Sequence, residues 1–175
     1  MTALEVYELT TQGGATDFAR LIRACESFGP YCLIGGLAVN CYVEPVYTLD
    51  ADIVVVSAIL GDLKVHLEER GFKTEIHQHS VNARAAGSEL RIQFTTDERY
   101  QAFPARSVEA DVLGIRVKIA CLEDVTQGKL WAYGDPRRRL SKRKKDELDL
   151  IRIAEAYPHL KSVLPSELRD EIDND

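Results

Sequence analysis

Hydrophobic residues first recur at helical spacing, and the members of this set are Phe18, Leu21, Ile22 and Cys25. The spacing predicts an amphipathic helix over residues 16–28, with Thr16 or Asp17 as its cap and Gly29-Pro30 as its end. A second amphipathic pattern predicts a helix over residues 57–70, with Ser57 as the cap and Gly71 just past the end. Both helices carry enough apolar side chains on one face to pack against a sheet.

Short apolar or alternating runs between the helices predict β-strands, and these cover residues 31–34, 50–56, 72–77, 89–94, 107–112 and 115–119. Later residues return to helical spacing over 122–133 and 141–157, with Pro158 after the second helix. In that last helix the residues expected to face inward are Leu148, Ile151, Ile153 and Ala154. The acidic tail beyond it is expected to fray.

This order of elements predicts an α/β (α+β) fold, a small mixed β-sheet flanked by helices. We expect residues 1–120 to form the core with the sheet and residues 121–175 to form a helical C-terminal extension packed on it. A chain of 175 residues is long enough to bury a hydrophobic core of this kind.

Composition narrows the class of protein. The chain is 45% hydrophobic and 29% charged, as in ordinary globular proteins, and contains no apolar run long enough for a membrane span. The first residues resemble no secretion signal, so a cytoplasmic location is the default expectation. Four cysteines without paired spacing predict buried free thiols rather than a zinc site, and these are Cys25, Cys32, Cys41 and Cys121.

Two short motifs carry the candidate chemistry. Gly35 and Gly36 follow a short apolar strand and open a predicted helix over residues 37–42. Asp50 and Asp52 then stand one residue apart in a β-branched run, so their side chains share one face of a strand. Two adjacent carboxylates repel each other unless a cation lies between them, and carboxylate oxygens suit Mg²⁺ (or Mn²⁺). A glycine turn before a helix lets backbone N–H groups approach a phosphate.

Each motif also has a purely structural interpretation, namely a tight strand–helix turn and a solvated strand start. In this order and at this spacing they favour a site for phosphoryl or nucleotidyl transfer.

With these two motifs the chain resembles the polymerase-β-type nucleotidyltransferase superfamily, whose signature is a glycine turn followed by Asp-x-Asp. The resemblance is greater to its minimal branch, the AbiEii-type toxins of toxin–antitoxin and abortive-infection systems. In that branch Gly-Gly-x-Ala precedes Thr-x-Asp-x-Asp, as do Gly35-Gly36-Leu37-Ala38 and Thr48-Leu49-Asp50-Ala51-Asp52 here. The resemblance implies the nucleotidyltransferase fold, bound Mg²⁺ and a nucleoside triphosphate (NTP) as substrate.

The C-terminal half is similar to the same branch through Lys129 on one helix and Lys145-Asp146 at the start of the next. The resemblance implies that Asp50, Asp52 and Lys129 are catalytic, the two aspartates as metal ligands and the lysine as a balance for phosphate charge. It assigns nucleotide binding to Gly35, Gly36, Thr48, Lys145 and Asp146. Asp146, with Asp149 one turn on, can equally pair with the preceding arginines.

Two positions depart from the pattern. A later strand usually supplies a third carboxylate, but Gln93 stands at the corresponding position here. Glutamine cannot accept the proton of a hydroxyl at neutral pH. Glu89 is too far along the strand to replace it, and Val46 occupies a position where the branch often has arginine. Either the substrate or a water accepts the proton, or the protein binds nucleotide with weakened or no turnover.

Basic residues crowd one stretch of an otherwise acidic chain, whose net charge is −6. The run between residues 137 and 145 includes the candidate acceptor contacts Arg137, Arg138, Arg139 and Arg143. It is either a surface for a polyanion or a solvated helix entry, and nearby Trp131 and Tyr133 could stack on a base or pack in the core.

These residues predict a Mg-dependent nucleotidyltransferase that moves an NMP from an NTP to an acceptor hydroxyl. The resemblance implies that the acceptor is RNA, especially tRNA, or a protein, and that a cognate antitoxin exists. The rival interpretations are a nucleotide-binding or regulatory protein without turnover, and a transferase that modifies a small molecule such as an antibiotic.

Overall fold

The computed structural model describes residues 2–174. The helices are α1 (Ala3–Thr10), α2 (Gly14–Phe28), α3 (Gly35–Val39), α4 (Ser57–Glu69), α5 (Leu122–Gly134), α6 (Leu140–Ala156) and α7 (Ser166–Asp173). The strands are β1 (Tyr31–Ile34), β2 (Asp50–Val55), β3 (Phe72–Ile76), β4 (Ser80–Ala85), β5 (Arg91–Thr95), β6 (Val108–Val112) and β7 (Ile115–Ile119). Three short 3₁₀ segments join them, at Glu98–Tyr100, Phe103–Arg106 and Pro158–Val163.

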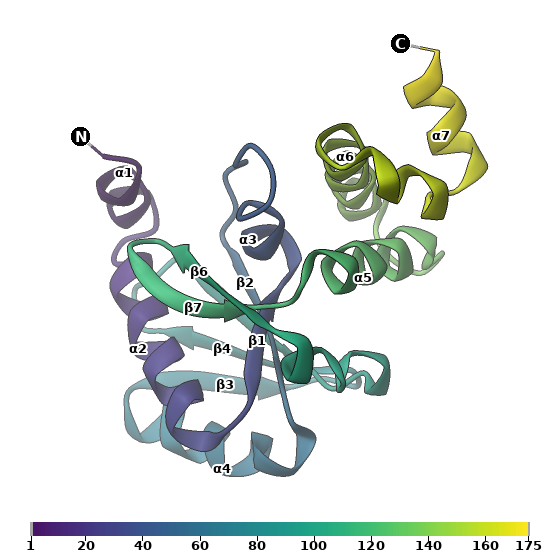
Figure 1. The fold of residues 1–175 in the computed structure, drawn as a ribbon. Coiled ribbons are helices and arrows are strands. Elements are labelled where there is room, and N and C mark those ends of the chain that lie inside the picture. The colour runs from purple at the N-terminus through teal and green to yellow at the C-terminus, as the bar shows by residue number, and fades with distance from the viewer. Residues whose placement is uncertain (1, 175) are drawn as a thin grey trace.

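One mixed sheet holds all of these strands in the order β3-β4-β5-β2-β1-β7-β6 (Figure 1). The pairs β2–β5 and β1–β7 are parallel, and the other neighbours are antiparallel. Strand β2 lies at the centre of the sheet, so residues that alternate along it face one side or the other of the whole molecule. The expected fold class, a mixed sheet flanked by helices, is confirmed.

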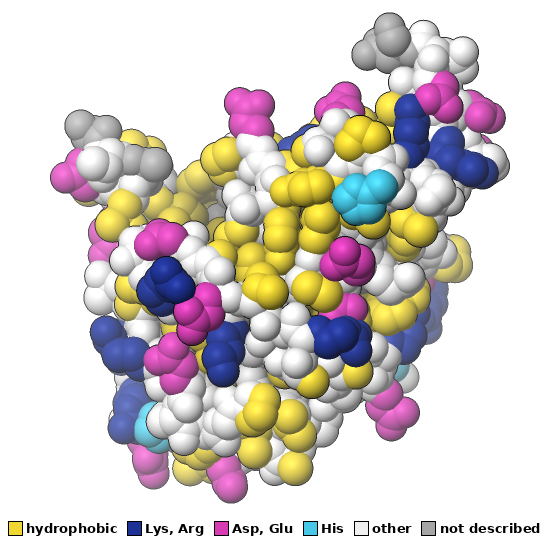
Figure 2. All heavy atoms as spheres, viewed as in Figure 1, with side chains coloured by type: hydrophobic (Ala, Val, Ile, Leu, Met, Phe, Trp, Pro, Cys, Tyr) yellow, Lys and Arg dark blue, Asp and Glu magenta, His cyan; other side chains and the backbone are white. Residues whose placement is uncertain are grey.

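Helices α2 and α4 pack against each other and cover one face of the sheet (Figure 1). The core beneath them contains Phe18, Leu21, Ala51 and Ile53, each fully buried. On the outer, solvent-facing side of α2 and α4, basic and acidic side chains are interspersed and form no continuous basic stripe (Figure 2). Asp50 and Asp52 alternate with Ala51 and Ile53 and therefore lie on the opposite face of the sheet.

The chain after residue 120 forms helices α5, α6 and α7 beside the sheet (Figure 1). Part of this region joins the main core through Val125 and Ile153. A second, smaller cluster consists of Leu150, Ala154, Leu164 and Leu168. The division into a core over residues 1–120 and an extension over residues 121–175 stays a prediction. Within residues 2–174, none of the helices combines the length and the apolar character that crossing a membrane requires.

The structure corrects several local expectations. Strand β4 is not among the predicted strands, because its alternating buried residues are Val81, Ala83 and Ala85, with little β-branched signal. The predicted strand over residues 89–94 begins later, at Arg91. The tail forms α7 with Leu168 buried rather than fraying, and α1 forms at the other end of the chain.

The predicted cap residues of two helices and one predicted inward-facing residue were also wrong. The caps of α2 and α4 are Gly13 and Val56, so the predicted cap residues lie inside the helices. In α6, Leu148 is exposed and Leu150 is buried in its place.

The four cysteines are free thiols, with Cys25 and Cys32 buried and Cys41 and Cys121 partly so. Burial raises the pKa of Cys25 and of Cys32 to about 12 in each case, so neither forms the reactive thiolate near neutral pH. We expect iodoacetamide at pH 8 to leave these two thiols unmodified in the native protein and to alkylate them in guanidinium. Peptide mass spectrometry would measure this, and rapid native labelling of Cys25 would contradict the packing described here.

Candidate active site

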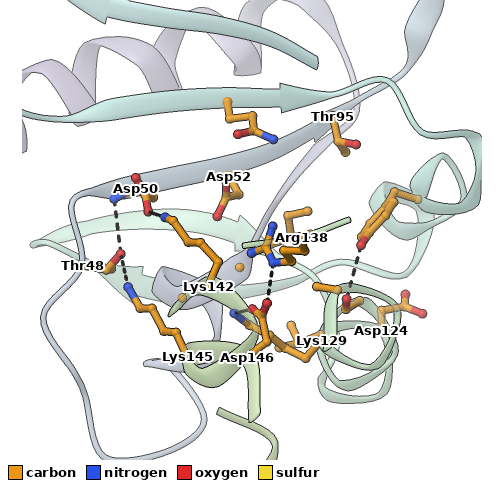
Figure 3. Close-up of a pocket in the computed structure, with 18 of the residues that line it drawn as sticks. Thr48, Asp50, Asp52, Thr95, Asp124, Lys129, Arg138, Lys142, Lys145 and Asp146 are labelled. Atoms are coloured by element: carbon orange, nitrogen blue, oxygen red, sulfur yellow. Dashed lines mark hydrogen bonds and ion pairs between the residues drawn. The ribbon is translucent and has the colours of Figure 1, made fainter. Parts of the chain in front are cut away.

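The two aspartates project side by side from β2 into a hollow between the sheet and the C-terminal helices (Figure 3). Register fixes their neighbours, since Asp50 pairs with Arg91 and Asp52 with Gln93 on the parallel strand β5. On the other side, Asp52 pairs with Ile34, the last residue of β1. The sheet therefore sets Asp52 directly beside the glycine corner that begins α3.

Gly35 has a left-handed backbone with φ +68°, and Asp52 packs directly against it. A Cβ at Gly35 would lie 2.2 Å from Asp52 Oδ2 and 3.0 Å from its Cγ. A Cβ at Gly36 would instead find ordinary contacts at 3.6 Å from Thr48. The first glycine is thus required by the close approach of the carboxylate, and the corner and the Asp-x-Asp motif form one structural unit.

We expect Gly35→Ala to destabilise the fold by about 1–3 kcal/mol, because the substitution imposes both backbone strain and a clash with Asp52. Gly36→Ala is the matched control, and its effect should stay below about 1 kcal/mol, since α3 has room for this methyl group. Urea denaturation of the two variants would compare them. Equal losses of stability would contradict this description of the corner.

Asp50 is held by two cations from distant parts of the chain. Arg91 Nε lies 2.8 Å from its Oδ1. Lys142 Nζ donates to its Oδ2 at 2.8 Å (Figure 3). Burial raises the pKa of Asp50, but the hydrogen bond and charge of Lys142, with the charge of Arg91, outweigh it and lower the pKa overall. Asp50 is therefore a carboxylate at neutral pH, and a metal ion would compete with both side chains for it.

Asp52 has a different environment, because no side chain within residues 2–174 donates a hydrogen bond to it or forms an ion pair with it. Burial raises the pKa of Asp52, and the neighbouring charge of Asp50 raises it further. A cation between the two carboxylates would relieve both effects. Hard oxygen donors of this kind fit Mg²⁺. Among residues 2–174, no group of three or more His, Cys, Asp or Glu side chains is arranged to hold a metal ion.

The hollow in front of the glycine corner has a volume of about 220 Å³ and is here called the corner cleft. Its polar wall contains Gly35, Gly36, Thr48, Asp50, Asp52, Lys142 and Lys145. Lys145 Nζ lies 3.3 Å from Thr48 Oγ1, so α6 reaches across to the segment that leads into β2 (Figure 3). The lining also includes the apolar or aromatic side chains Ile34, Tyr100, Phe103, Val125 and Ala132. Charged groups together with aromatic rings suit a nucleotide.

A buried ion cluster supports the floor of this cleft. Lys129 Nζ lies 2.9 Å from Asp146 Oδ1 and 2.7 Å from Asp149 Oδ2, and all three side chains are at most 9% exposed. Arg138 adds a bond to Asp146 at 2.6 Å, and Arg152 one to Asp149 at 2.7 Å. Burial lowers the pKa of Lys129, but Asp149 and Asp146 more than offset this and raise its pKa overall. The cluster therefore joins α5 to α6 as paired charges.

A second hollow of about 680 Å³ opens on the other side of the aspartates, over β3, β4 and β5, and is here called the sheet hollow. Both hollows contain Asp50, Asp52, Gln93 and Lys142. The sheet hollow also contains Lys73, Thr74, Glu75, Asn82, Ala83, Arg84, Arg91 and Ile92. The two aspartates thus lie where the two hollows adjoin.

The structure gathers most of the sequence-predicted residues at the corner cleft, but not the whole basic run. Arg138 lines the cleft, whereas Arg137, Arg139 and Arg143 line neither hollow. Trp131 stacks at 5.9 Å on Phe103 and lies edge-on to Tyr100 at 5.1 Å, so it packs behind the cleft wall. Tyr133 packs against the second hydrophobic cluster.

Sequence reasoning missed four residues that shape the site, namely Arg91, Tyr100, Phe103 and Lys142. Alternation over residues 89–94 puts Arg91 on the same strand face as Gln93, but only the β2–β5 register brings it to Asp50. For Lys142, Tyr100 and Phe103 the sequence offers no comparable signal.

No protein-family model matches the chain, and comparison with curated proteins finds no match. Solved structures do resemble it. ANT(2'')-Ia in complex with adenylyl-2''-tobramycin has a TM-score of 0.62 and 16% identity, over 91% of this chain and 97% of that one. A solution structure of the antibiotic-resistance factor ANT(2'')-Ia gives 0.53 and 16%, over 90% and 89%. An antigenic nucleotidyltransferase-like protein from Paracoccidioides brasiliensis gives 0.54 and 20%, over 92% and 86%. The chain therefore has the fold of nucleotidyltransferases.

Proposed function

We propose that this protein is a nucleotidyltransferase that moves an NMP from an NTP to an acceptor hydroxyl. The observation that carries the proposal is the pair Asp50 and Asp52 on one face of β2, with Asp52 against the glycine corner and a hollow on each side. The fold shared with nucleotidyltransferases supports it. A solely structural role would not account for a carboxylate such as Asp52, which faces a cleft without any donor among the described residues.

In this proposal the corner cleft holds the NTP. The backbone of Gly35 and Gly36 approaches the phosphates, with Thr48 and Lys145 beside them. Tyr100 and Phe103 supply an apolar wall for the base. Lys129 on α5 and Asp146 on α6 form an ion pair and thereby hold these two helices together as one wall of the cleft. Because their charges already neutralise each other, their role is to support this wall.

Asp50 and Asp52 would hold Mg²⁺ or Mn²⁺, which when bound offsets phosphate charge and orients the triphosphate. The acceptor oxygen forms a bond to the α-phosphorus of the NTP, the bond from that phosphorus to the bridging oxygen breaks, and pyrophosphate leaves. Gln93 can donate a hydrogen bond to the acceptor hydroxyl or accept one from it, but it cannot remove the hydroxyl proton. The proton therefore passes to a water or to the substrate itself.

The narrower assignment follows the sequence resemblance. We propose an AbiEii-type, toxin-like member whose acceptor is RNA, such as tRNA, or a protein hydroxyl, with a cognate antitoxin as partner. The matches of Gly35-Gly36-Leu37-Ala38 and of Thr48 through Asp52 support this assignment.

Incubation with MgCl₂ and each α-³²P-labelled NTP, with total RNA or a protein extract as acceptor, tests the function. We expect label on one acceptor class with release of pyrophosphate, and loss of both in EDTA. Unlabelled acceptors together with no binding of any nucleotide would contradict the proposal.

A second candidate function is nucleotide binding without turnover, and Gln93 favours it because it stands beside Asp52 in register. Gln93→Glu separates the two candidates. The protein is a binding module if wild type binds nucleotide but transfers label only at the background rate, and the variant exceeds that background by about 10²–10⁴-fold, the usual contribution of general acid–base catalysis. Transfer by wild type would contradict this candidate.

A further inference from the structure

Strand β3 forms one edge of the sheet, and no strand among residues 2–174 pairs with its outer side (Figure 1). The bonds from β3 to β4 alternate along the strand. His77 N–H donates to Ser80 O at 2.8 Å, so the β3–β4 register assigns the next bonds with β4 to Glu75 and Lys73. The remaining N–H and C=O groups point to the open edge and can bind another strand, and they belong to Phe72, Thr74 and Ile76.

The two charged side chains of β3 are exposed and opposite in sign. Lys73 forms no ion pair with another residue of the described chain. The side chain of Glu75 is 75% exposed and lies 3.5 Å from His77, which carries a charge only when it is protonated. Ile76, on the other face of the strand, is 69% exposed. Charges on an edge strand usually discourage pairing, whereas two charges of opposite sign can attract a second copy of the same strand.

A two-fold axis through Thr74 matches these features. Two antiparallel copies of β3 centred there set Lys73 opposite the partner's Glu75. This charged pair falls at a position without backbone bonds, where opposed side chains are closest. Phe72 then lies opposite the partner's Ile76, and the outward-facing groups exchange about six backbone hydrogen bonds. Centring on Lys73 or on Glu75 would set like charges directly opposite each other, and a centre between residues would leave N–H groups without partner carbonyls.

The other edge of the sheet has the opposite character. Strand β6 carries Glu109 and Asp111, and a two-fold axis through Ala110 would set these acids opposite each other. Like charges directly opposite each other destabilise a pair of strands. One edge of the sheet therefore disfavours its own copy, whereas the β3 edge complements it.

We propose that two copies of this chain associate through β3 and form one continuous sheet across a two-fold axis. Such an axis requires a surface that complements itself, and the charges of β3 meet this requirement. Lys73 and Glu75 also line the sheet hollow, so the partner's strand extends the floor of that hollow. Neither candidate catalytic aspartate takes part in this association, which is therefore independent of the proposed function.

Sedimentation equilibrium of the full chain measures the association. Because β3 has 5 residues, the interface is small, and we expect a dissociation constant of about 10 μM for wild type. Glu75→Lys and Lys73→Glu each replace two attractive pairs with two repulsive pairs, and each should weaken dimerisation about tenfold or more. Asp170→Lys makes the same change in charge as Glu75→Lys, on the exposed surface of α7 and far from β3 (Figure 1), and should leave the dimer unchanged.

Two further measurements separate this interface from a general effect of charge or a damaged fold. An equimolar mixture of Glu75→Lys and Lys73→Glu should form dimers again, as should the double variant, since each restores opposite charges across the axis. Amide hydrogen exchange at Thr74 should be slow in the wild-type dimer and fast in Glu75→Lys. The Lys73 amide should stay protected in both, because its bond is to β4.

Loss of the dimer in each single variant, with recovery in the mixture, supports the proposal. A wild-type chain that stays monomeric at the highest concentration overturns it and leaves the edge to a strand of another protein. A dimer that neither charge reversal weakens overturns β3 as the interface. Nucleotide binding and label transfer are measured separately, so failure here is distinguishable from failure of the proposed function.

Discussion

Asp52→Asn is expected to abolish tight Mg²⁺ or Mn²⁺ binding and to reduce label transfer at least about 100-fold, since even outer-shell changes at metal sites cost 10–100-fold. The variant keeps the shape of the side chain against Gly35 but removes the charge that a metal requires. It also removes repulsion from Asp50 in a buried setting. The metal-free variant should therefore be as stable as wild type or more stable, by up to about 2 kcal/mol.

The combination of lost metal binding with retained or increased stability distinguishes a functional carboxylate from a structural one. Isothermal titration with MgCl₂, electron paramagnetic resonance of Mn²⁺ and urea denaturation would measure the two effects. Asp62→Asn, on the exposed surface of α4, is the matched control and should change neither. Unchanged Mn²⁺ affinity in Asp52→Asn would contradict the metal site.

Lys129→Met is expected to have the largest effect on stability, about 3 kcal/mol, because it leaves two buried carboxylates without their shared cation. Asp146 keeps Arg138 and Asp149 keeps Arg152, which limits the loss. For a chain of this length the expected fall in melting temperature is about 6–12 °C. The helices α5 and α6 should become the least stable part of the fold, as hydrogen exchange would show.

The pH dependence of this effect follows from the raised pKa of Lys129, whose ordinary value is 10.5. A raised folded pKa gives stability that is fully present below the unfolded pKa and is lost as pH rises through the folded pKa. The difference between wild type and Lys129→Met should thus be constant from pH 7 to about 9. Lys144→Met, which removes a lysine 63% exposed and paired with Glu147, is the control and should cost less than about 1 kcal/mol.

If Lys129→Met were as stable as wild type but lost label transfer, a direct catalytic role would replace the supporting role proposed here. If it were less stable and lost activity only above its lower melting point, the supporting role would stand. Thermal melts and label transfer on the same preparation distinguish these outcomes.

Local sequence was sufficient to predict the centre of the site, namely the two aspartates and the glycine corner. The β-branched run after Asp52 forms a strand, and a period of two turns both aspartates to one side whatever lies around them. Two glycines after a short apolar strand predicted the corner. The structural reason is that Gly35 has a left-handed backbone and packs against the Asp52 carboxylate, where a Cβ has no room. The general order of helices and the mixed sheet followed from periodicity in the same way.

Tertiary structure alone decided which distant residues meet these two motifs. Lys142 reaches Asp50 from 92 residues away, and the choice of Lys142 rather than another lysine of the run depends on how α6 packs. Lys73 on β3 and Arg91 on β5 line the same hollow only because β4, which has a weak strand signal, lies between these strands and pairs with both. Periodicity assigns a side chain to a face of its own strand, whereas the order and register of strands in a sheet are set by contacts between segments far apart in the chain.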